Sequence, residues 1–131
     1  MKTLIVEDDF VSRLLLQTFL SRYGECHIAV NGQEALDAFK RASFSGSPYH
    51  LICMDIHMPG MNGKDAVTSI RALEQSYGIS STQGVKIIMT TAEPDFNVVI
   101  QSFMELCDAY LFKPVDTGKL LHELQRFRLV E

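Results

Sequence analysis

The chain has 131 residues, of which 47% are hydrophobic and 21% charged, which is typical of one compact domain with a full core. We therefore expect a single domain over residues 1–131. The formal net charge of −4 and the pI near 5.5 argue against direct binding to nucleic acid or anionic membranes, which needs clustered Lys and Arg. The N-terminus holds an apolar run of only three residues, so we expect no signal peptide or membrane span and a cytoplasmic location.

Short apolar runs alternate along the chain with longer segments of helical periodicity. This pattern is typical of repeated strand and helix units around a parallel sheet. The runs lack polar alternation, as expected for strands that are covered on both faces. Five strands are predicted, at Thr3–Val6, His27–Val30, Leu51–Met54, Val85–Met89 and Ala109–Phe112.

The segments between these runs carry start and stop signals of helices, such as a capping Asn or Asp before an apolar stripe and a Gly after it. The stretches SFSGSPYH and GISSTQGV are polar and are predicted to be surface loops. The predicted helices are Phe10–Tyr23 closed by Gly24, a helix from the cap Asn31 through Phe39, a helix after Asn62 with Ala66, Ile70, Leu73 and Tyr77 on one face, a fourth at about Asp95–Met104, and a last helix capped by Asp116 that carries Leu120, Leu124 and Phe127.

Five strand and helix units with right-handed crossovers favour a doubly wound α/β fold with three layers. In such sheets ligands bind beyond the carboxyl ends of the strands, so the residues that follow each strand are candidates for function. A carboxylate cluster, an isolated Asp, two hydroxyls and a Lys are expected to meet at this rim: Glu7, Asp8 and Asp9 after the first strand, Asp55 after the third, Thr90 and Thr91 after the fourth, and Lys113 and Pro114 after the fifth.

Grouped carboxylates repel one another, so a cation is expected among them. Oxygen ligands without a cluster of His or Cys indicate a hard ion such as Mg²⁺ or Mn²⁺. Such an ion, together with Lys113, suits phosphoryl transfer to a carboxylate, with Asp55 as a possible nucleophile. Each feature alone is common in solvated loops and turns, and the prediction rests on their agreement at four strand ends. The three cysteines, Cys26, Cys53 and Cys107, lack a C-x-x-C spacing and are assigned no chemistry.

The segments TLIVEDD, MDIHMPGMNG, IIMTTAE and DAYLFKP occur in the order and spacing of response-regulator receiver domains, and the sequence resembles this family over essentially its whole length. The chain stops soon after the last predicted helix, so it is most similar to stand-alone receivers of the chemotaxis type. The resemblance implies a flavodoxin-like (βα)5 sandwich with strand order 2-1-3-4-5. It also implies a phosphoprotein of a two-component phosphorelay.

The resemblance assigns the metal and the phosphoryl group to particular residues. Asp55 corresponds to the phosphoacceptor, and Glu7 and Asp8 correspond to the acidic pair. Asp8 and Asp55 are then expected to bind Mg²⁺ or Mn²⁺ directly, together with the backbone carbonyl of His57, whereas Glu7 acts largely through water. Asp9 falls one place beyond the pair.

The resemblance also implies a switch and a control on the lifetime of the phosphoryl group. Thr91 corresponds to the hydroxyl that contacts the phosphoryl group, Lys113 to its salt-bridge partner, and Tyr110 to an aromatic that changes orientation on activation. His57 and Glu93, each two places after a site residue, are expected to flank the path of a hydrolytic water.

Departures from the family pattern lie away from this site. Leu106 and Cys107 stand where many receivers have Gly-Ala, and the loops around Ser45 and Ser81 look longer than in a minimal receiver. Pro114 matches a peptide that is often cis in the family. The departures bear on partner surfaces rather than on the chemistry of Asp55.

The expected partners are a sensor histidine kinase or phosphotransfer protein as phosphoryl donor and a downstream protein as target. The target is expected because the sequence shows no output module up to Glu131, unless the chain is a fragment of a longer regulator or hybrid kinase. The chain is expected to be a monomer or a phosphorylation-dependent dimer, and to promote only its own phosphorylation and dephosphorylation. Three alternatives stay open. A phosphatase of the haloacid dehalogenase type requires a second Asp where His57 stands, a nucleotide binder requires a glycine-rich loop where EDDF stands, and a docking domain requires no phosphorylation.

Overall fold

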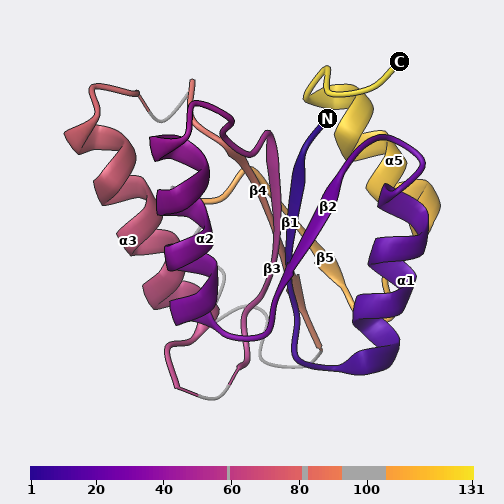
Figure 1. Cartoon of the computed structure of the whole chain (residues 1–131). Helices are drawn as coiled ribbons and strands as arrows, with labels where there is room; N and C mark the ends of the chain where they lie inside the picture. Colours follow the sequence, from indigo (N-terminus) through magenta and orange to yellow (C-terminus); the bar gives the residue numbers. More distant parts are fainter. Residues whose placement is uncertain (59, 81–82, 93–105) are drawn as a thin grey trace.

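The computed structural model describes residues 1–58, 60–80, 83–92 and 106–131. A five-stranded parallel sheet has the order β2-β1-β3-β4-β5 and is covered by helices on both faces, which confirms the predicted fold class (Figure 1). The strands are β1 (Thr3–Val6), β2 (Cys26–Ala29), β3 (Leu51–Asp55), β4 (Lys86–Thr91) and β5 (Ala109–Phe112), and the helices are α1 (Phe10–Leu20), α2 (Gly32–Phe44), α3 (Gly63–Ser76) and α5 (Thr117–Arg126).

Several predicted boundaries were wrong by a few residues. β2 begins one residue earlier than predicted, and β3 and β4 extend to Asp55 and Thr91, so these two site residues end strands rather than follow them. α1 ends at Leu20 instead of Tyr23, and α2 continues five residues past Phe39, through part of the predicted SFSGSPYH loop. The buried Ala42, one turn after Phe39, extends the core-facing stripe of α2 and explains this continuation. The predicted fourth helix at Asp95–Met104 lies outside the described residues.

The predicted capping residues hold the helix starts. Asn31 accepts a hydrogen bond from the Glu34 amide at 2.8 Å, and the Glu34 carboxylate reaches back to the Val30 amide at 2.9 Å. Asn62 and Asp116 cap α3 and α5 in the same way. These side chains satisfy amide donors that have no partner within the helix. They fix the start of each helix shortly after the carboxyl end of the preceding strand.

The core consists of two apolar layers, one on each face of the sheet. α2 and α3 cover one face and α1 and α5 the other, as Figure 1 shows. Side chains alternate between the layers along each strand: in β3, Ile52 and Met54 pack toward α2 and α3, and Leu51 and Cys53 toward α1 and α5. Burial raises the pKa of the Cys53 thiol to about 12, so it stays protonated as a core side chain. No helix in the described ranges is long and apolar enough to cross a membrane.

Candidate functional site

The carboxyl ends of β1, β3 and β5 bring three of the predicted site residues into direct contact. Glu7 follows β1, and its amide continues the ladder to β2 by donating to the Ala29 carbonyl at 3.0 Å, which turns its carboxylate inward. Asp55 is the last residue of β3, and Lys113 comes directly after β5. Glu7 and Asp55 are only 1% and 4% exposed. Two buried carboxylates and one partly exposed ammonium therefore meet at the rim.

Lys113 bridges the two buried carboxylates. Its Nζ lies 2.5 Å from Oε1 of Glu7 and 3.1 Å from Oδ2 of Asp55. The Lys113 amide donates to the Thr91 carbonyl at 2.8 Å, so the end of β4 fixes the backbone from which the side chain extends. The second oxygen of Asp55 accepts a hydrogen bond from the His57 amide at 3.1 Å. One oxygen of Asp55 thus faces the ammonium, and the loop after β3 orients the other.

The electrostatics of the site leave negative charge unbalanced. Burial, followed by the neighbouring Asp55, raises the pKa of Glu7 to about 7, against the opposing effect of Lys113. Burial opposes the charged form of Lys113, but Glu7 and Asp55 outweigh it and raise the pKa of the ammonium. Oε2 of Glu7 is buried and has no hydrogen-bond partner in the described structure. A single Lys does not satisfy this group of carboxylates, so a further cation fits the site.

The acidic cluster has the donor set of a hard metal ion. Glu7, Asp8 and Asp55 each offer a carboxylate oxygen, and these oxygens lie within 4.8 Å of one another. All three predicted carboxylate ligands are therefore brought together, with Asp8 on the solvent side. Oxygen-only ligands suit Mg²⁺ or Mn²⁺, which keep several waters and take few protein carboxylates. The ligand role of the His57 carbonyl stays a prediction.

The proposed switch residues lie on one face of neighbouring strands. Met89 of β4 pairs with Tyr110 of β5, and both pack in the layer covered by α2 and α3. Thr91 comes two residues after Met89 and so faces the same layer. The Thr91 hydroxyl is buried and donates to the Ala92 carbonyl at 3.2 Å, whereas the Tyr110 ring lies edge-on to Phe112 at 6.0 Å. Thr91 and Tyr110 therefore lie on the same face of neighbouring strands, and the switch itself stays a prediction.

The remaining predicted positions have structural roles, are untested, or lie outside the described residues. Asp9 caps α1, and its hydrogen bonds from Ser12 lower the pKa of its carboxyl. The Lys113–Pro114 peptide is cis, as the resemblance implied. The side chain of His57 is exposed. Its expected effect on hydrolysis stays a prediction, and Glu93 lies outside the described residues.

Sequence reasoning missed two contacts that shape the site. It expected Lys113 to face the phosphoryl group, and the shorter contact of its ammonium is with Glu7. It also took the Asn62-Gly63 pair only as a helix start. A Cβ on Gly63 would lie 2.3 Å from the Asp55 carbonyl oxygen, so α3 begins directly against the end of β3. The sequence signal for this close approach is a Gly directly after a capping Asn, which is ambiguous with a turn.

The raised pKa of Glu7 predicts a pH-dependent stability for the metal-free domain. Between pH 4.5 and 7 the folded chain keeps a Glu7 proton that the unfolded chain has lost, so stability from this group falls as pH rises through 7. Glu7→Gln is expected to remove this slope and to stabilise the metal-free protein at pH 8 by roughly 1–3 kcal/mol. Urea unfolding in chelator from pH 5 to 8, followed by circular dichroism, measures it. If the free energy of unfolding depends on pH equally in the wild type and in Glu7→Gln, the prediction is contradicted. Glu131→Gln at the exposed terminus is the control and should behave like the wild type.

Comparisons with known proteins agree with this architecture. The model of the response regulator receiver domain family matches residues 3–125. Response regulator SSK1 of Verticillium dahliae is 40% identical over 97 residues, which cover 70% of this chain and 11% of that protein. The chain spans between 5% and 16% of the length of such curated relatives.

Two solved structures show the same fold. One is the Saccharomyces cerevisiae receiver domain of Ssk1, co-crystallised with the histidine phosphotransfer signaling protein Ypd1. It has a TM-score of 0.80 at 30% identity, covering 97% of this chain and 88% of that one. The receiver domain of the Arabidopsis thaliana histidine kinase CKI1, complexed with Mg²⁺ and BeF₃⁻, has a TM-score of 0.78 at 28% identity, covering 95% and 89%. With its family match over nearly the whole length and its three carboxylates beside Lys113, this chain belongs to the response regulator receiver domain family.

Proposed function

We propose that the chain accepts a phosphoryl group on Asp55 in a Mg²⁺-dependent reaction and passes the signal on through a conformational change. The observation that carries the proposal is the contact of 3.1 Å between Lys113 Nζ and Asp55 Oδ2 beside the oxygens of Glu7 and Asp8. It supplies a nucleophilic carboxylate, a fixed positive charge and a metal-type donor set in one place.

In the proposed reaction, a carboxylate oxygen of Asp55 attacks the phosphorus atom of a phosphohistidine or of acetyl phosphate. A P–O bond to Asp55 forms, the bond to the leaving imidazole or acetate breaks, and the leaving group keeps the electron pair. Lys113 balances charge on the phosphoryl oxygens, and the His57 amide holds the carboxylate in place. A divalent ion held by Glu7, Asp8 and Asp55 would supply further positive charge to these oxygens. The chain thereby promotes only its own modification.

The phosphoryl donor is proposed to be a sensor histidine kinase or a histidine phosphotransfer protein. Support comes from the similar receiver of Ssk1, whose co-crystal partner is a phosphotransfer protein. It also comes from the start of α1, next to Glu7 and Asp8, where Phe10, Val11 and Leu14 are exposed apolar side chains. Such a patch beside the acidic site suits a donor that must cover the rim while it delivers its phosphoryl group.

The test compares two donors under controlled metal. With acetyl phosphate and Mg²⁺, intact mass should show a gain of one phosphoryl group, which chelator abolishes. Labelling that is equal with and without chelator would defeat the metal dependence.

With a phosphorylated histidine phosphotransfer protein as donor, Val11→Glu should slow transfer at least tenfold, because it places a charge in the apolar patch. The same variant should keep its rate with acetyl phosphate, and an equal loss with both donors would contradict docking at α1.

A further inference from the structure

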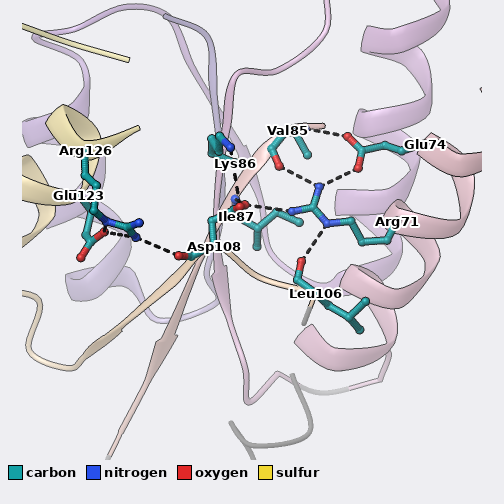
Figure 2. A network of polar contacts seen from close by, with 9 residues as sticks. All are labelled: Arg71, Glu74, Val85, Lys86, Ile87, Leu106, Asp108, Glu123 and Arg126. Atoms are coloured by element: carbon teal, nitrogen blue, oxygen red, sulfur yellow. Dashed lines mark hydrogen bonds and ion pairs between the residues drawn. The ribbon is translucent and has the colours of Figure 1, made fainter. Parts of the chain in front are cut away.

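A polar cluster holds the beginning of β5 (Figure 2). It lies at the amino end of this strand, whereas Asp55 lies at the carboxyl end of the parallel strand β3. We call it the Arg71 network, made by the side chains of Arg71, Glu74 and Asp108 and by backbone groups of Val85, Ile87 and Leu106. Arg71 of α3 donates from Nε to the Leu106 carbonyl at 2.8 Å and from Nη2 to Oδ2 of Asp108 at 3.0 Å. Its Nη1 donates to the Val85 carbonyl at 2.9 Å and to Oε1 of Glu74 at 2.7 Å. One guanidinium therefore ties α3 to the segments that precede β4 and β5.

Asp108 extends the pairing of β4 and β5 by one residue. Its amide donates to the Ile87 carbonyl at 2.8 Å, and its Oδ2 accepts from the Ile87 amide at 2.8 Å, where a strand carbonyl would otherwise be needed. From the other face of the sheet, Arg126 of α5 donates to the Asp108 carbonyl at 3.0 Å. Figure 2 shows the two arginines reaching Asp108 from opposite sides. Asp108 thus sets the register of β5 and joins both helical layers.

The network has little freedom to rearrange. Glu74 is 3% exposed, and its second oxygen accepts from the Val85 amide at 2.7 Å. A Cβ on Gly84 would lie 2.4 Å from both carboxylate oxygens, so the chain before β4 closes tightly over Glu74. Arg71 and Glu74 are largely buried and hydrogen-bond to each other and to the Val85 backbone, so a shift of either side chain would leave a charge without a partner.

Two elements, α3 and β5, connect the Arg71 network with the acidic site. At its start, α3 rests on the phosphoacceptor strand, since the Gly63 amide donates to the Ile56 carbonyl at 3.1 Å. Two turns later, Arg71 of the same helix holds Asp108. β5 connects Asp108, which precedes it, with Lys113, which follows it. The Lys113 ammonium in turn contacts Asp55. In the described structure, β5 has four residues and pairs only with β4, so as a short edge strand it depends on its ends for position.

We propose that Arg71 and Asp108 are positioning residues for phosphoryl transfer, which set β5 along β4 so that the Lys113 ammonium reaches Asp55. Neither residue touches the reacting atoms. The inference rests on the proposed phosphorylation of Asp55 for its kinetic consequence, but the position of Lys113 is measurable without phosphorylation.

The first experiment measures the exposure of Lys113 in the metal-free protein. Asp108→Asn keeps an acceptor for the Ile87 amide and removes the charge that pairs with Arg71. Brief labelling with an amine-reactive reagent, followed by peptide mass mapping, should show severalfold more modification of Lys113 relative to the exposed Lys119. Ile70→Val, a core change on the same helix without a network contact, is the matched control and should leave the ratio unchanged. An unchanged ratio in Asp108→Asn and in Arg71→Lys would overturn the proposal.

The second experiment is a double-mutant cycle on the rate of labelling by acetyl phosphate. Lys113→Ala should slow the wild type on the order of tenfold or more, and should slow Asp108→Asn by less than threefold, because Lys113 is already displaced there. In the Ile70→Val background, Lys113→Ala should slow labelling by the same factor as in the wild type. An equal factor in all three backgrounds would mean that the network only stabilises the fold. If wild type takes up no phosphoryl group at all, the proposed function fails, and the lysine labelling still decides the positioning role.

Discussion

Asp55→Asn is expected to gain no phosphoryl group from acetyl phosphate, at a Mg²⁺ concentration where the wild type is fully labelled. The carboxamide has nearly the shape of the carboxylate, but its single oxygen can accept from either Lys113 or the His57 amide, which contact different oxygens of Asp55. It lacks the negative charge of the proposed nucleophile and removes one of the three carboxylates that are proposed to hold the metal. Intact mass after timed incubation measures the effect, which should be loss of labelling to below detection.

The control for this variant separates chemistry from folding. Asp37→Asn makes the same chemical change on the exposed face of α2 and should be labelled like wild type. Circular dichroism of Asp55→Asn should match that of the wild type. Persistent labelling of Asp55→Asn, mapped to Asp8 or Asp9, would show that another carboxylate at the rim accepts the phosphoryl group and would refute the assignment of Asp55.

Much of the fold could be predicted because its signals are local. The five apolar runs are strands, since strands buried on both faces need no polar alternation, and their parallel order follows from the crossover rule. Glu7, Asp55 and Lys113 could be placed together for the same reason, because each lies at the carboxyl end of a strand of one parallel sheet. Knowing the order of elements was enough to bring together residues that are 106 positions apart.

The contacts that escaped prediction depend on tertiary packing. Arg71 falls next to the buried stripe of α3, where a charged residue is normally read as solvated, and its partners come from three separate segments. Glu74 is buried although it is charged and is followed by the polar Gln75 and Ser76, because the Val85 amide and Arg71 satisfy its oxygens. Periodicity records which helix face is apolar, and it carries no information on polar groups that are buried in pairs.

Thr91→Ala is expected to separate binding at Asp55 from the response of Tyr110. Beryllofluoride, a mimic of the aspartyl phosphate, should still bind in the presence of Mg²⁺, because Asp55, Lys113 and the acidic cluster are intact. The resonance shifts of Tyr110 on binding should fall by more than half. A ligand shifts a conformational equilibrium only through a difference in contacts between the two states, and the hydroxyl of Thr91 is proposed to make that difference.

Thr90→Ala is the matched control, because the two threonines are neighbours in β4 and point to opposite faces of the sheet. The Thr90 hydroxyl lies 3.5 Å from the Met54 carbonyl oxygen. Its side chain points away from the layer that holds Tyr110. Its loss should leave the shift of Tyr110 as large as in the wild type. If Thr91→Ala responds like the wild type, or if both variants lose the shift equally, the hydroxyl of Thr91 does not carry the signal. The loop after β3 would then be the next candidate route, because the His57 amide contacts the Asp55 carboxylate directly.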